Sequence, residues 1–196
     1  MKKSILWVIS LLFMVSFTMG SCEETDGAVD PYANWVERNQ AYIDSIAMVA
    51  KANPDEWKMI HTYKFVPPLT ELTQNVNDYV YCKVLEQGTG TIKPIFTDTV
   101  STHYRGQLIP LYDGSKLVFD QSFQGNLNPN VAVPVDFAVN GVIEGWTTAL
   151  QEMHEGDRWE IYIPYNLAYG KIGSSSIPGY STLIFDVSLV KITTDR

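Results

Sequence analysis

The sequence has 196 residues, of which 45% are hydrophobic and 18% are charged, as is typical of one globular domain with a modest extension. It carries 14 basic and 22 acidic side chains, for a formal charge of −8, and this argues against nucleic-acid binding, which depends on basic side chains that displace counterions. The two cysteines form no Cys-x-x-Cys pair and no Cys/His cluster, so they indicate neither a disulfide scaffold nor a metal site.

The N-terminal residues have the pattern of a secretory signal. Lys2 and Lys3 precede an apolar run over residues 5–17, which is short of the roughly 20 residues needed to span a bilayer. Met19-Gly20-Ser21-Cys22 follows and resembles a bacterial lipobox. We therefore predict a lipoprotein-type signal peptide over 1–21 and lipidation at Cys22; the alternative is a plain cleavage site with Cys22 as a bystander. Removal of Lys2 and Lys3 with the leader takes the formal charge from −8 to −10.

Residues 22–30 are acidic and are predicted to form a flexible tether, with Glu23, Glu24 and Asp26 near its start. Acylation would anchor the protein to the cell envelope, since two or more acyl chains give stable attachment. The outer membrane is the expected location. The sequence leaves open whether the protein faces the periplasm or the cell surface.

Residues 31–66 are predicted to form a helical extension. Trp35, Tyr42, Ile46 and Val49 recur at helical spacing, and Pro31 suits a first turn. Pro54 should end the helix, and residues 55–60 are predicted to resume a short one. Two interpretations stay open: the apolar stripe packs on the main domain, or it forms a dimerisation or partner helix, which would make the protein a homodimer.

Pro67-Pro68 marks the start of the main domain, 67–196, where alternating apolar residues replace the helical period. Strands are predicted over 79–85, 97–108, 157–163 and 182–192. One helix is predicted over 145–154, because its apolar residues fall on one face: Trp146, Ala149, Leu150 and Met153. Several strands and one helix indicate an α+β domain with a sheet packed on that helix.

The usual catalytic sets are poorly represented in the sequence. The histidines lie far apart, no Gly-x-Ser-x-Gly elbow is present, and Cys82 is predicted to be a buried, inert thiol in a strand. Aromatic residues are instead abundant near glycine- and proline-marked turns, which suits an apolar pocket.

Ordered sequence blocks between about 79 and 192 carry a resemblance to a known family. The blocks are His103-Tyr104-Arg105-Gly106, Phe119-Asp120, Val142-Ile143-Glu144-Gly145-Trp146, Ile163-Pro164, Leu167-Ala168-Tyr169-Gly170, Ile177-Pro178 and Leu183-Ile184-Phe185-Asp186-Val187. Together they resemble an FKBP-type peptidyl-prolyl cis-trans isomerase of the secreted bacterial, macrophage-infectivity-potentiator kind. The sequence between Leu108 and Leu117 is longer than is usual in that family and predicts an extra loop.

The resemblance implies an FKBP-like antiparallel β-sheet wrapped around one short α-helix, with an N-terminal helical extension. It implies that Tyr104, Asp120 and Tyr169 are the catalytic residues and that Trp146 is the floor of the substrate pocket. The other substrate-binding residues would be Phe119, Val135, Phe137, Val142, Ile143, Ile177 and Phe185. In this arrangement Asp120 accepts a hydrogen bond from the Tyr104 hydroxyl, while the Ile143 N–H and the Tyr169 hydroxyl hold carbonyls that flank the proline.

The same resemblance implies isomerisation of Xaa-Pro bonds in exported polypeptides without a metal or cofactor, and it implies that macrolide-type inhibitors could bind the pocket. Two other classes stay open. One is a lipid-anchored FKBP-like chaperone or binding module without useful turnover. The other is a surface protein that contacts its partners through residues 30–66.

Overall fold

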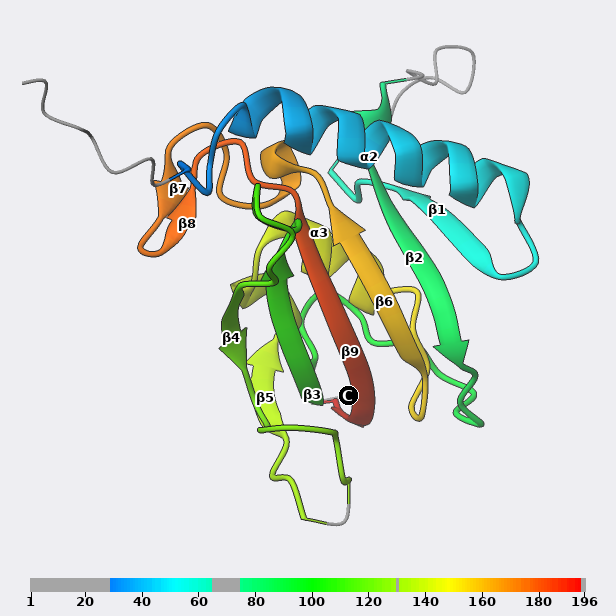
Figure 1. The fold of residues 1–196 in the computed structure, drawn as a ribbon. Helices are drawn as coiled ribbons and strands as arrows, with labels where there is room; N and C mark the ends of the chain where they lie inside the picture. The colour runs from blue at the N-terminus through cyan, green and yellow to red at the C-terminus, as the bar shows by residue number, and fades with distance from the viewer. Residues whose placement is uncertain (1–28, 65–74, 130, 195–196) are drawn as a thin grey trace, which may run out of the picture.

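The computed structural model describes residues 29–64, 75–129 and 131–194 (Figure 1). The predicted signal peptide, most of the tether, the lipidation at Cys22 and the Pro67-Pro68 joint lie outside the described residues. No helix within the described ranges is long and apolar enough to cross a membrane.

A seven-stranded sheet forms the centre of the molecule (Figure 1). Its strands, in spatial order, are β1 (Trp57–His61), β2 (Tyr79–Glu86), β6 (Arg158–Ile163), β9 (Leu183–Thr193), β3 (Thr99–Leu108) and β4 (Val118–Gln121), and β5 (Val135–Ala138) also pairs with β3. Every pairing is antiparallel. A separate small hairpin consists of β7 (Gly173–Ser174) and β8 (Ile177–Pro178). The short 3₁₀ turns are η1 (Val76–Asp78), η2 (Val139–Gly141) and η3 (Tyr165–Leu167).

Strands β6 and β9 confirm the alternating patterns in the sequence. One face of β6 and β9 is buried as predicted, by Trp159, Ile161, Ile163, Leu183, Phe185, Val187 and Leu189. Cys82 of β2 is fully buried, and burial raises the pKa of its thiol, as expected for an inert packing residue.

Helix α3 (Glu144–Leu150) packs against the buried face of the sheet and is shorter than the predicted 145–154. After Leu150 the N–H groups of Glu152 and Met153 bond to carbonyls only three residues back, which tightens the chain into turns. Gly156 then takes a left-handed conformation with φ 90°. Met153 is nevertheless buried, so the apolar spacing was correct although the helix ends earlier.

Residues 57–61 form β1, so the predicted short helix over 55–60 is wrong. The ring of Trp57 is buried and stacks on Tyr162 of β6, with the ring centroids 5.5 Å apart. The backbone of β1 pairs with β2, Trp57 lying opposite Lys83. These contacts come from distant residues and override the local helical pattern. The extension therefore contributes an edge strand to the sheet of the main domain.

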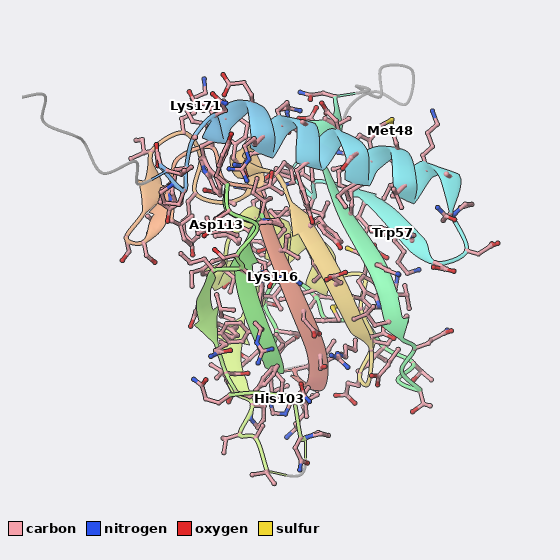
Figure 2. All side chains as sticks on the ribbon, viewed as in Figure 1. Met48, Trp57, His103, Asp113, Lys116 and Lys171 are labelled. Carbon is pink, nitrogen blue, oxygen red and sulfur yellow. The ribbon has the colours of Figure 1, made fainter. Side chains whose placement is uncertain are left out.

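Helix α2 (Trp35–Ala52) lies across the strands at one end of the sheet (Figure 1). Its buried residues are Trp35, Asn39, Ile43, Ala47 and Ala50. Tyr42 and Ile46 are half-buried and Val49 is exposed, so the inward face is rotated from the predicted stripe. Figure 2 shows Trp57 beneath this helix and Met48 on its outer side. The expectation that the extension packs on its own domain is confirmed.

Polar contacts hold the start of α2 against the main domain. The indole N–H of Trp35 donates to Ser181 Oγ at 3.0 Å, and Asn39 Oδ1 accepts the N–H of Thr182 at 2.7 Å. The predicted extra loop between β3 and β4 is also present and reaches this region. Its Tyr112 N–H donates to the carbonyl of Pro31 at 3.0 Å.

Candidate active site

A cavity of about 470 Å³ lies between the sheet and α3. Its lining comes from elements far apart in the sequence: Tyr104, Phe119, Asp120, Phe137, Gly141, Val142, Ile143, Trp146, Tyr169 and Phe185. A volume of this size is typical of a small-molecule or peptide side-chain site.

The Trp146 ring lies at the centre of the aromatic lining. It meets Tyr104 and Phe137 at centroid distances of 5.5 Å and Phe185 at 5.2 Å, with interplanar angles of 70–87°. Phe119 meets Phe185 edge to face at 5.6 Å. Edge-to-face contacts of this kind stabilise aromatic clusters beyond simple burial and hold each ring in one orientation. The cavity wall is therefore preorganised.

Gly106 on β3 permits this arrangement. A Cβ at Gly106 would lie 2.6 Å from the Phe185 ring and 2.7 Å from the Phe119 ring, which is closer than real Cβ contacts allow. Gly106 also pairs with Asp120 on β4 and with Phe185 on β9. A glycine at this position therefore lets both rings approach the backbone of β3.

The predicted hydrogen bond between Tyr104 and Asp120 is present. The phenol donates to Asp120 Oδ2 at 2.9 Å. Burial, together with this bond and the Asp120 charge, raises the pKa of Tyr104 to about 12. The hydroxyl is therefore protonated at physiological pH and acts as the donor. Ser122 fixes the backbone of this pair, because its N–H donates to the Tyr104 carbonyl at 2.9 Å and its Oγ accepts the Tyr104 N–H at 2.9 Å.

The start of α3 positions the residues on the helix side of the cavity. The Ile143 carbonyl accepts the N–H groups of Trp146 and Thr147, and the Thr147 hydroxyl donates to the Val139 carbonyl at 2.7 Å. The N–H of Ile143 itself makes no hydrogen bond to any described residue. Glu144 accepts a short hydrogen bond from Thr62 and pairs with Lys64 at 2.7 Å. The segment after β1 thus contacts the first turn of the helix that carries Trp146.

The structure brings together most of the residues predicted for the site. Nine of them line the cavity: Tyr104, Phe119, Asp120, Phe137, Val142, Ile143, Trp146, Tyr169 and Phe185. Val135 does not, because it lies two residues before Phe137, about 6.6 Å further along β5. Ile177 does not either; it is buried in β8, paired with β7.

Gly141 lines the cavity and was not predicted. Its signal in the sequence is the Asn140-Gly141 dipeptide, a turn pair placed just before the helix. Its contribution comes from backbone, which side-chain reasoning overlooks. Within the described part of the chain, no group of three or more His, Cys, Asp or Glu side chains could hold a metal ion.

An antiparallel sheet packed on one short helix, with an aromatic pocket between them, defines the FKBP class of fold. The family model for FKBP-type peptidyl-prolyl cis-trans isomerase matches residues 90–190, and the chain belongs to this family. The crystal structure of a peptidyl-prolyl cis-trans isomerase from Pseudomonas syringae pv. tomato is similar, with a TM-score of 0.58 and 27% identity over 86% of this chain and 100% of that chain.

Curated relatives agree with this assignment. The chain is 47% identical over 111 residues to the FKBP-type 22 kDa peptidyl-prolyl cis-trans isomerase of Escherichia coli (strain K12), covering 56% of this chain and 48% of the relative. It is 40% identical over 112 residues to the outer membrane protein MIP of Legionella longbeachae, covering 56% and 42%. The chain spans about half the length of the curated relatives it matches.

Proposed function

We propose that the protein catalyses cis–trans isomerisation of Xaa-Pro bonds in exported polypeptides and assists their folding at the cell envelope. The observation that carries the proposal is the preorganised aromatic cavity around Trp146, with the Tyr104–Asp120 hydrogen bond at its side. A cavity of this shape and polarity suits a pyrrolidine ring. Membership of the isomerase family supports the same conclusion.

The chemistry explains why such a site needs no nucleophile. Amide resonance sets the barrier to peptide-bond rotation at about 18–20 kcal/mol. The two Xaa-Pro isomers differ by only about 0.5–1 kcal/mol, yet they exchange over tens to hundreds of seconds. A catalyst therefore has to favour only the twisted amide. An apolar cavity does so by removing water from the imide carbonyl, whose hydration stabilises the planar, charge-separated form.

Each polar group has a defined role in this proposal. The N–H of Ile143 and the hydroxyl of Tyr169 hold carbonyls of the client chain on either side of the proline. Neither donor bonds to another described residue. Tyr104 keeps its proton because its pKa is raised to about 12, and Asp120 orients it. The aromatic rings of Trp146 and Phe185 pack against the pyrrolidine ring of the client's proline.

The envelope location rests on the sequence and on the relatives. The leader and the lipobox-like Met19-Gly20-Ser21-Cys22 support lipidation at Cys22 and attachment to the outer membrane. One relative bears the name outer membrane protein MIP. Homodimerisation through α2 stays a prediction, supported by the exposure of Met48 and Val49 on that helix.

The test is an isomerisation assay with short proline-containing peptides that differ in the residue before proline. The wild-type chain should accelerate exchange, and Trp146→Leu should lower kcat/KM by at least about tenfold, which equals about 1.4 kcal/mol of transition-state stabilisation. Trp57→Leu is the matched control, because Trp57 is also a buried tryptophan but lies outside the cavity. Macrolide binding without acceleration of exchange would instead identify a binding module.

A further inference from the structure

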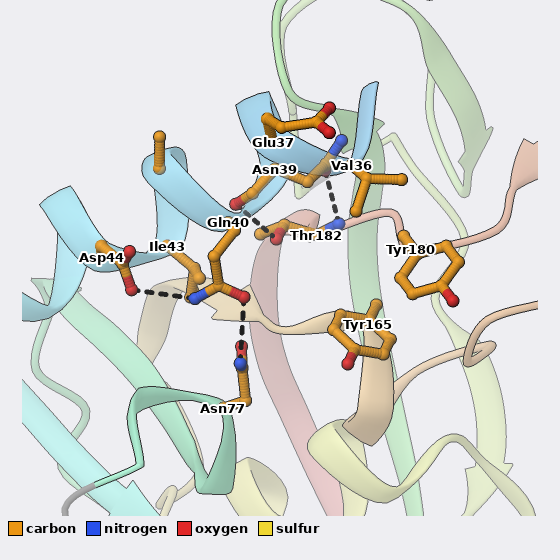
Figure 3. A pocket seen from close by; sticks show the side chains of 11 residues that line it. Val36, Glu37, Asn39, Gln40, Ile43, Asp44, Asn77, Tyr165, Tyr180 and Thr182 are labelled. Carbon is orange, nitrogen blue, oxygen red and sulfur yellow. Dashed lines mark hydrogen bonds between the residues drawn. The ribbon is translucent and has the colours of Figure 1, made fainter. Parts of the chain in front are cut away.

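A second cavity, of about 460 Å³, lies between α2 and the segments that carry Tyr165 and Tyr180 (Figure 3). None of its lining residues lines the active-site cavity. One wall is the face of α2 from Val36 to Asp44, and the opposite wall contains the two tyrosine rings. We call this cavity the helix groove.

The aromatic wall of the helix groove consists of two tyrosines, one of which has an unusual backbone conformation. The rings of Tyr165 and Tyr180 have their centroids 5.1 Å apart and are both half-buried. Tyr180 has φ 61°, a left-handed conformation that is rare for a bulky side chain. Its N–H donates to the Gly170 carbonyl at 3.0 Å, which holds the backbone in place. Figure 3 shows both rings across the groove from α2.

The helix wall of the groove combines apolar side chains with side-chain amides and two carboxylates. The side-chain amide of Gln40 donates to Asp44 Oδ1 at 2.9 Å and accepts from Asn77 Nδ2 at 3.0 Å. The amides of Gln40 and Asn77 each have a second N–H beyond these bonds. Asp44 and Glu37 form no ion pair with a described residue, and no Lys, Arg or His lines the groove. The groove therefore presents two carboxylates that its own walls do not neutralise.

The dimensions of the groove suit an extended chain. The helix wall from Val36 to Asp44 spans about 12 Å at the α-helical rise. An extended strand covers that length in about four residues. The tyrosine rings and Val36 offer apolar surface, the amides offer partners for a backbone, and the carboxylates attract a cation. The acidic tether with Glu23, Glu24 and Asp26 has the wrong charge to fill it.

We propose that the helix groove binds an extended, basic segment of a polypeptide, in which an apolar residue stands beside a lysine or arginine. That these segments belong to the isomerase's own clients rests on the proposed function.

The groove also adjoins the active site through one loop. The Tyr165 carbonyl accepts the N–H groups of Ala168 and Gly170, which flank Tyr169 of the active site. A client docked in the groove therefore raises the effective concentration of its prolines near the pocket.

The experiment measures the binding of a fluorescent, proline-free peptide of alternating lysine and leucine to the whole chain by fluorescence anisotropy. Without proline, the peptide reports on the groove independently of isomerase activity. We expect saturable one-to-one binding that weakens at high salt. The double variant Glu37→Gln/Asp44→Asn should weaken binding at least about fivefold, the equivalent of losing two partly exposed ion pairs. The matched control is Asp55→Asn/Glu56→Gln, which removes two exposed carboxylates outside the groove.

Three results would overturn the proposal: equal affinity for the counterpart peptide in which glutamate replaces lysine, equal losses in the groove and control variants, or no binding at all. If the groove variant changes the sedimentation of the chain but leaves peptide affinity intact, a second copy covers the groove and the proposal fails. Isomerisation of a short peptide by the groove variant is measured in parallel. If the peptide does not bind but isomerisation persists, the groove proposal fails and the proposed function stands.

Discussion

The Tyr104 hydroxyl is held in place by its hydrogen bond to the Asp120 carboxylate, and its raised pKa keeps it protonated. Tyr104→Phe keeps the ring contacts with Phe137 and Trp146 and removes only this donor. We expect kcat/KM for a short peptide to fall by about three- to tenfold, the equivalent of one hydrogen bond.

A second buried tyrosine provides the control for that variant. The Tyr81 hydroxyl donates to the Val76 carbonyl at 2.8 Å, outside the active-site cavity. Tyr81→Phe should therefore lower stability about as much as Tyr104→Phe while leaving the rate of isomerisation unchanged. Equal activity in the two variants would remove the Tyr104 hydroxyl from the mechanism.

His103, next to Tyr104 on β3, should make stability depend on pH. Its side chain is buried, its Nδ1 has no hydrogen-bond partner among the described residues, and burial lowers its pKa below the ordinary 6.5. Above about pH 6.5 the imidazole is neutral in both the folded and unfolded chain. Below that pH the unfolded chain binds a proton that the folded chain resists, so stability falls as the pH falls.

The measurement is the urea midpoint at pH 8 and at pH 5.5. His103→Gln should shrink the difference between the two midpoints, because the variant has no imidazole to protonate on unfolding. An unchanged difference would show that His103 does not contribute to acid sensitivity.

At the scale of elements, the packing of helix α2 on the main domain depends on the buried side-chain amide of Asn39. Asn39 is 1% exposed, and it accepts the N–H of Thr182 and donates to the Trp35 carbonyl at 2.7 Å. Asn39→Ala leaves the buried Thr182 N–H without its partner, which should destabilise the fold by about 1–3 kcal/mol. Asn53→Ala, at the exposed end of the same helix, is the matched control and should cost much less. Urea denaturation of both variants measures the difference.

The elements also show what local patterns can and cannot predict. β6 and β9 follow the alternation of their side chains, because the alternating apolar residues share one buried face. β2 and β3 are strands as predicted, but each has three consecutive buried residues, so both of their faces are covered. β1 was predicted as helix because the partners that make it a strand, β2 and Tyr162, are distant in sequence. The rotation of α2 away from its predicted stripe has the same cause. Asn39 faces inward because Thr182 provides a partner there.

For the molecule as a whole, the extension is part of the folding unit. α2 buries Trp35, Ile43 and Ala47 against the sheet, and each large apolar side chain contributes about 1.5–3 kcal/mol when buried. A chain shortened to residues 54–196 should therefore melt at a clearly lower temperature than one of residues 29–196 and should bind a hydrophobic dye. Equal melting temperatures would mean that α2 is dispensable for the fold.

Sequence periodicity was enough to predict the α+β class, four central strands and the pocket helix, and the family resemblance was enough to predict nine residues of the cavity. The periodicity, and the ordered motifs that carry the resemblance, are present in the chain whatever its distant contacts. Three outcomes are visible only in the folded molecule: residues 57–61 form a strand, Val135 and Ile177 lie away from the cavity, and α2 forms a second, acidic groove with Tyr165 and Tyr180. Each of these outcomes depends on the pairing of surfaces far apart in sequence, which no local pattern specifies.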